Sequence, residues 1–172
     1  MTMGWAWLIL VLATYPWLLG AELATDALAS SSLAVFVSGA VLIAPSRRLR
    51  RWQTVLFAAC VGFLFEARRP LPDGCVALTL IAASIFLSSN RPLLRNSPGM
   101  FRAAVAVNVI ACLAWLAGAV AVSPVSSADT LWLGFLQLLL SAVAGGAAFI
   151  PVTLTQNAVM DRLGVPPAPE TA

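Results

Sequence analysis

Histidine and lysine are absent from this sequence, and its charged residues are ten arginines and seven acids in a chain of 172. Histidine is the commonest metal ligand and a frequent general base, so its absence argues against most metal and acid–base sites. Cys60, Cys75 and Cys112 are scattered, which is neither a disulfide framework nor a metal-ligand pattern. We therefore expect no metal and no cofactor, and cysteines that act as small apolar side chains.

Charge is scarce in general. Charged residues make up 10% of the chain, against about a quarter in soluble domains, and hydrophobic residues make up 60%. The mean hydropathy is +0.92. Long apolar runs with short polar breaks are typical of a polytopic membrane protein. The pI of about 9.2 does not indicate nucleic-acid binding, because the arginines stand at the ends of apolar runs rather than on a basic face.

The apolar runs predict an all-α integral membrane protein of about six transmembrane helices. An N-terminal signal peptide is the competing interpretation of the first run, but that run has no basic residue before it. The third and fourth segments are short for a hydrocarbon core of about 30 Å. One domain of residues 1–160 holds the expected helices, and residues 161–172 form a short polar cytoplasmic tail. The helices are expected at about 3–21, 27–44, 53–66, 75–89, 103–122 and 131–158.

Two of these segments carry further expectations. Ser30, Ala34 and Ser38 are spaced by four residues in the second segment, and predict a small-residue stripe for close helix packing. Gly145, Gly146 and Pro151 interrupt the last segment, and predict a kink or a break there.

The arginines are unevenly distributed between alternate loops. With six spans and the N-terminus inside, eight arginines fall on the cytoplasmic side and two fall outside. This bias predicts that both termini are cytoplasmic. Arg47, Arg48, Arg50 and Arg51 form the densest cluster, which could lie against anionic lipid headgroups or meet an acidic cytoplasmic partner.

The stretch GFLFEARRPLPDG, from Gly62 to Gly74, forms the outer tip of a short helical hairpin. Its charges could simply mark the membrane boundary. Alternatively, Glu66 could point inward and pair with Arg68 or Arg69 to lock the hairpin, because a buried acid usually has a partner. A proton or ion relay is a third interpretation, although the segment offers no second acid or histidine within the membrane.

Other polar residues within the apolar segments favour packing over chemistry. The side chains of Asn108, Gln137 and Gln156 can form hydrogen bonds between helices, or line a ligand cavity. Ser141, Gly145 and Gly146, with Pro151 beyond them, form a small-residue patch that could receive a helix of this domain or of a partner. We find no nucleophile–base pair, no paired carboxylates and no phosphate-binding glycine loop, and so do not expect an enzyme.

The hairpin resembles one in the MreD family of rod-shape-determining membrane proteins. In that family a glycine, three apolar residues, an acid, a short loop and a second glycine join the third and fourth spans. Here Gly62, Glu66 and Gly74 stand at those places, with glutamate where aspartate is common and a charged, proline-containing loop. The resemblance covers six spans over about 160 residues. It implies a fold similar to the substrate-binding subunits of vitamin (ECF-type) transporters.

The resemblance also implies a function. It suggests a non-catalytic scaffold of the cell-wall elongation complex in the bacterial inner membrane, acting in cell shape. The expected partners are membrane lipids, an MreC-type protein, peptidoglycan synthesis enzymes and the MreB filament. Two alternatives stay open: a substrate-binding transporter subunit, and a channel or lipid-handling protein. The transporter subunits carry an Ala-x-x-x-Ala pattern in their first helix, whereas here Leu10 follows Ala6 and Trp17 follows Ala13 at that spacing.

Overall fold

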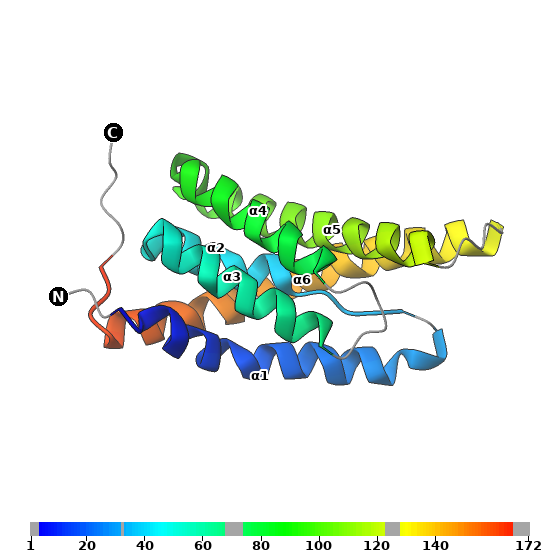
Figure 1. Cartoon of the computed structure of the whole chain (residues 1–172), viewed down its shortest axis with the longest axis horizontal. Helices are drawn as coiled ribbons and strands as arrows, with labels where there is room; N and C mark the ends of the chain where they lie inside the picture. Colours follow the sequence, from blue (N-terminus) through cyan, green and yellow to red (C-terminus); the bar gives the residue numbers. More distant parts are fainter. Residues whose placement is uncertain (1–3, 32, 68–73, 123–127, 167–172) are drawn as a thin grey trace.

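A computed structural model of the chain describes residues 4–31, 33–67, 74–122 and 128–166, and these residues form an all-helical bundle without strands. Figure 1 shows the helices running roughly along one long axis. In chain order the elements are α1 (Ala6–Ala27), η1 (Ala29–Ser31), α2 (Ser38–Arg48), α3 (Arg51–Glu66), α4 (Cys75–Ser89), η2 (Arg91–Leu94), α5 (Ser97–Val122) and α6 (Ala128–Arg162).

The apolar pattern located most helices well. The segments expected at 53–66 and 75–89 correspond to α3 and α4, while α1, α5 and α6 extend beyond the runs that predicted them. Of the kink or break expected near Gly145 and Gly146 or at Pro151, the break is wrong, because α6 is one α-helix of 35 residues. The kink stays a prediction. Packing of α6 against α1, α2 and α5 supports the helix on both sides of these residues.

The second segment is not the single helix expected at 27–44. α1 continues to Ala27, a 3-10 turn follows, residues 33–36 run as an extended trace (Figure 1) to the N-cap residue Val37, and only then does α2 begin at Ser38. Ser30, Ala34 and Ser38 therefore share no helix face, and the predicted packing stripe is wrong. Serine side chains compete with helical hydrogen bonding, and the Val35–Val37 run favours extended backbone, which explains the local preference.

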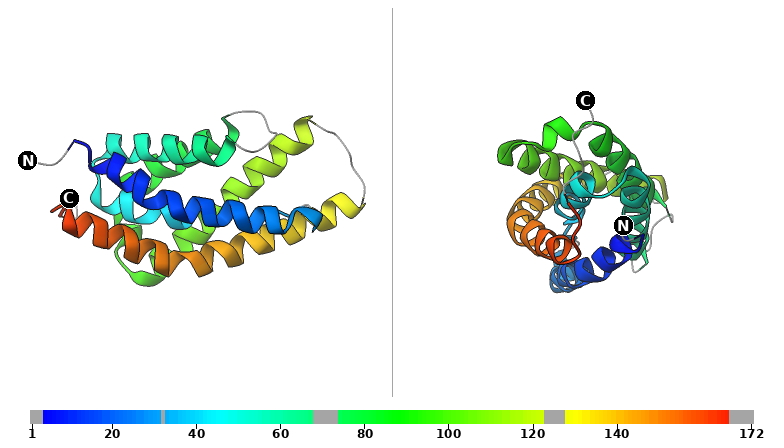
Figure 2. Two further views of the ribbon diagram at one scale, coloured as in Figure 1. Left: turned by 90° about the horizontal axis from the view of Figure 1, so that it is seen from below. Right: turned by 90° about the vertical axis from the view of Figure 1, so that its left-hand side faces the viewer.

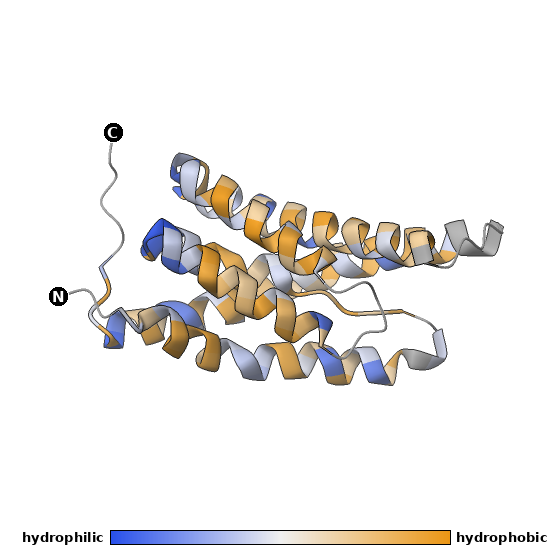
Figure 3. Cartoon of the chain, viewed as in Figure 1, coloured by the Kyte–Doolittle hydropathy of each residue, from blue (hydrophilic) through white to orange (hydrophobic). Residues whose placement is uncertain are grey.

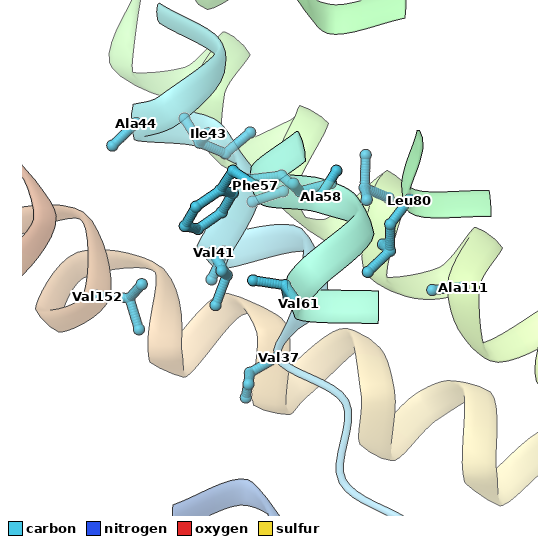
Figure 4. Packing of buried hydrophobic residues seen from close by; sticks show 14 of the residues in the cluster. Val37, Val41, Ile43, Ala44, Phe57, Ala58, Val61, Leu80, Ala111 and Val152 are labelled. Atoms are coloured by element: carbon cyan, nitrogen blue, oxygen red, sulfur yellow. The ribbon is translucent and has the colours of Figure 1, made fainter. Parts of the chain in front are cut away.

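α2 is the central helix of the bundle. Every residue from Ser38 to Ser46 is buried, and α3, α4, α5 and α6 all pack against it (Figure 2). In Figure 4 side chains of α2 meet those of the helices around it, among them Val41 of α2, Phe57 of α3, Leu80 of α4, Ala111 of α5 and Val152 of α6. A helix buried all round needs no polar face, and the residues from Gly39 to Ala44 are all apolar.

Much of the outer surface is apolar, as Figure 3 shows in orange. Among the described residues, three helices are long and apolar enough to cross a membrane: Ala6–Ala27, Ser97–Ala121 and Trp132–Arg162. The start of α1, the arginine-rich end of α2 and the end of α6 lie at the same end of the bundle (Figures 1 and 3). The fold is thus all-α and compatible with a membrane location.

Candidate functional site

The candidate site with the most specific geometry is the hairpin of α3 and α4. Glu66, the last residue of α3, is 5% exposed. Its Oε2 accepts a hydrogen bond from the N–H of Gly74 at 2.8 Å. Its Oε1 accepts from the N–H groups of Val76 and, at 3.3 Å, of Ala77. The carboxyl group of one helix therefore caps the N-terminus of the next.

This capping has a clear physical reason. The first N–H groups of an α-helix have no partner within the helix, and an acid at that end also interacts favourably with the helix dipole. Gly74, at the N-cap position of α4, offers no side chain to do this. Glu66 supplies the missing acceptor from a position eight residues earlier in the chain.

The two glycines of the hairpin allow this arrangement. A Cβ atom on Gly62 would lie 2.4 Å from the Cα of Ala77, so only glycine lets α3 and α4 approach so closely. Gly74 has φ of 101°, a left-handed conformation that glycine adopts without steric cost. Arg68 and Arg69, the predicted partners of Glu66, lie outside the described residues. Among the described contacts, both oxygens of Glu66 bond to backbone.

A second polar cluster surrounds the extended segment at 33–36. Asn108 of α5 is fully buried. Its Oδ1 accepts from the N–H of Gly39 and the hydroxyl of Ser38, each at 3.2 Å. Its Nδ2 donates to the carbonyl of Phe36 at 2.6 Å and to that of Ser141 in α6. One amide thus joins α5, α6 and the start of α2.

Gln137 of α6 also forms hydrogen bonds with this segment. The N–H of Ala34 donates to its Oε1 at 2.8 Å, and its Nε2 donates to the carbonyl of Ala34. Further along α6, Gln156 donates to Thr14 Oγ1 at 3.1 Å and to the carbonyl of Val41 at 3.0 Å. Asn108 and Gln137 thus bond to backbone groups of Ala34 and Phe36, which lie outside any helix and would otherwise lack these partners.

Sequence reasoning expected these amides to bond between helices. It missed that Asn108 and Gln137 bond to non-helical backbone, because the interruption of the second segment was itself missed. The available signal was the coincidence of a serine run with two glutamine or asparagine side chains in otherwise apolar helices.

The small-residue patch of α6 faces other parts of this same chain. Ser141 is buried and its carbonyl accepts from Asn108. A Cβ on Gly145 would lie 2.6 Å from Asn108 Nδ2, and one on Gly146 would lie 3.3 Å from the ring of Phe101. Pro151 lies a little further along the same helix and is half-buried. The two glycines therefore make room for α5.

The four clustered arginines are not equivalent. Arg48 forms an ion pair with Asp161, which lies at the end of α6 and was expected to begin the short polar tail at 161–172. Arg50 donates its N–H to Gln53 Oε1 at 3.2 Å, where α3 begins, and Arg51 is exposed. Arg47 is half-buried and donates to Met100 Sδ at 3.2 Å.

Acidic and cysteine side chains do not form a metal-binding cluster among the described residues. Within the described ranges, three or more His, Cys, Asp or Glu residues nowhere lie close enough together to hold a metal ion. Comparison with family models, curated proteins and solved structures found no match. The function is therefore inferred from the geometry of the hairpin and of the buried amides.

Proposed function

We propose that this protein is a non-catalytic membrane scaffold of the cell-wall elongation complex, acting in the manner of the MreD family that its hairpin resembles. One observation supports this most directly. Gly62, Glu66 and Gly74, the residues on which the resemblance rests, act together as one structural unit, in which close packing, capping and a left-handed turn fix α4 against α3.

A structural role for the acid favours a scaffold over an ion or proton relay. A relay group must exchange protons or ions with neighbours along a path. Glu66 instead accepts hydrogen bonds from three backbone N–H groups. Asn108 and Gln137 likewise bond to backbone of this chain rather than line an open cavity.

The proposal includes six membrane crossings, with both termini in the cytoplasm of a bacterial cell and the bundle in the inner membrane. α1, α5 and α6 are long enough by themselves. Residues 33–37 and α2 together reach up to about 33 Å, from five non-helical residues and eleven helical ones, which matches a hydrocarbon core of about 30 Å. α3 and α4, with 16 and 15 residues, reach about 24 and 22 Å and would need local thinning.

The partners would be an MreC-type protein, the enzymes that synthesise peptidoglycan and, on the cytoplasmic side, the MreB filament. Docking between helices needs an exposed, rigid surface. The α3–α4 hairpin offers one, because Phe63, Leu78 and Phe86 are 56%, 68% and 58% exposed on helices that Glu66 holds together.

The test is a pull-down of the tagged protein from a bacterial membrane in mild detergent, with mass spectrometry of the proteins recovered. The scaffold predicts an MreC-type protein or wall-synthesis enzymes. A double variant, Phe63→Ala with Leu78→Ala, should lose them while still eluting as a single folded species. Ile110→Ala, at a 50% exposed position on α5, is the matched control.

Other results would overturn the proposal. Recovery of transport ATPases, or of a tightly bound vitamin-like small molecule, would favour a transporter subunit similar in fold to the ECF-type substrate-binding proteins. Ion or lipid flux in liposomes holding the purified protein alone would favour a channel or a lipid-handling protein.

A further inference from the structure

A groove of about 190 Å³ opens on the bundle surface where α2, α5 and α6 meet. Its lining comes from the last turns of α2, the first turn of α5 and the C-terminal half of α6. One part of the groove is polar, with Arg47, Ser97 and Asn157. The other is apolar, with Met100, Ile150 and Leu154 among its residues. The groove is therefore amphipathic and lies toward the arginine-rich end of the bundle.

The polar part carries the positive charge of Arg47, which pairs with no acid among the described residues. Arg47 is half-buried, and its described hydrogen bond goes to Met100 Sδ, a weak acceptor. Among the described residues, the ion pair at this end joins Arg48 to Asp161 and leaves Arg47 out. The groove also includes Ser97, at the N-terminus of the 26-residue helix α5, where the helix dipole adds partial positive charge. These features together favour an anion.

The apolar part indicates what else the ligand carries. Ile150 and Leu154 are 63% and 64% exposed and lie on one side of α6, within two turns of Asn157. A small soluble anion would leave these side chains bare. A ligand with both an acyl chain and a charged head would cover them and reach Arg47.

We propose that this groove binds one anionic phospholipid of the surrounding leaflet. Its headgroup phosphate contacts the Arg47 guanidinium, with Ser97 and Asn157 as hydrogen-bond donors, and an acyl chain lies along Ile150 and Leu154. This site is independent of the scaffold function and requires only that the bundle lies in a membrane. It also assigns lipid recognition to one arginine, whereas the sequence pattern suggested all four of Arg47, Arg48, Arg50 and Arg51.

The experiment uses the full chain purified in mild detergent, mixed with phosphatidylglycerol or phosphatidylcholine and examined by native mass spectrometry. We expect retention of a single phosphatidylglycerol in preference to phosphatidylcholine. Arg47→Gln should weaken this retention about fivefold, the usual effect of one arginine at an anionic surface. Arg51→Gln is the matched control, because Arg51 is exposed and lies outside the groove, and it should retain lipid as the wild type does.

A second pair of variants tests the apolar part without changing charge. Ile150→Trp should fill the groove and reduce phosphatidylglycerol retention. Leu139→Trp, at a 54% exposed position on the same helix outside the groove, should not. Equal loss in Arg47→Gln and Arg51→Gln would mean a diffuse charge effect and overturn the site. Full competition by millimolar inorganic phosphate, with no effect of Ile150→Trp, would overturn a lipid in favour of a soluble anion.

Discussion

Replacing Glu66 tests most sharply how the α3–α4 hairpin is held. In Glu66→Ala, the N–H groups of Gly74, Val76 and Ala77 lose their acceptor. A buried polar group left without a partner costs about 1–3 kcal/mol, and loss of an acid near a helix N-terminus costs a further 0.3–1 kcal/mol or so. The Gly74 N–H is only partly buried, so we count the other two in full. These terms sum to about 2–7 kcal/mol, and we expect a destabilisation of about 3–5 kcal/mol, near the middle of that range.

Glu66→Gln gives a graded intermediate. The glutamine Oε1 can still accept from Val76 and Ala77, while its NH₂ group faces the N–H of Gly74 in place of Oε2. One hydrogen bond is lost and two are kept, so we expect a destabilisation of about 1–2 kcal/mol. The order of stability is therefore wild type, then Gln, then Ala.

The assay is thermal unfolding of the detergent-solubilised protein, followed by the loss of the monodisperse peak in size-exclusion chromatography. At about 2–4 °C per kcal/mol for a chain of this size, Glu66→Ala should lower Tm by roughly 10 °C. Phe63→Ala, on the same helix but 56% exposed, is the control and should stay within about 2 °C of the wild type. If Glu66→Ala has the same Tm as Phe63→Ala, Glu66 does not stabilise the hairpin by capping α4.

Three further predictions use the same assay. Gly62→Ala places a Cβ 2.4 Å from the backbone of α4, so it should destabilise the protein by about 1–3 kcal/mol. Gly134→Ala, with nothing within 4 Å, should be neutral or stabilising, and equal shifts in Tm for the two variants would contradict the close approach of α3 and α4. Asn108→Leu removes four buried hydrogen bonds and should cost about 2–4 kcal/mol; a Tm within about 2 °C of wild type would show that the extended segment does not need the amide. Arg48→Ala breaks an ion pair in which Asp161 is 64% exposed, so the loss should stay below about 1 kcal/mol, and a much larger drop would mean that the pair is better shielded than its exposure indicates.

Local sequence determined the class of the protein and most of its helices. Apolar runs between arginines and prolines can form little other than helices that satisfy their own backbone, so α3 and α4 were located almost to the residue. The expected importance of Gly62, Glu66 and Gly74 came from the resemblance of their spacing to the MreD hairpin. None of these inferences depended on which helices are neighbours.

Tertiary structure decided the features that depend on distant partners. The extended backbone at 33–36 is stable because Gln137, 103 residues from Ala34, and Asn108, 72 residues from Phe36, bond to it. Likewise α6 stays whole through Gly145 because α5 fills the space there. A hydrophobic pattern shows which residues are buried but not which distant residues they contact, and so it could not reveal these contacts. For the same reason, only the folded chain distinguishes Arg47, which lies beside a groove and whose described hydrogen bond goes to Met100, from Arg48, which pairs with Asp161.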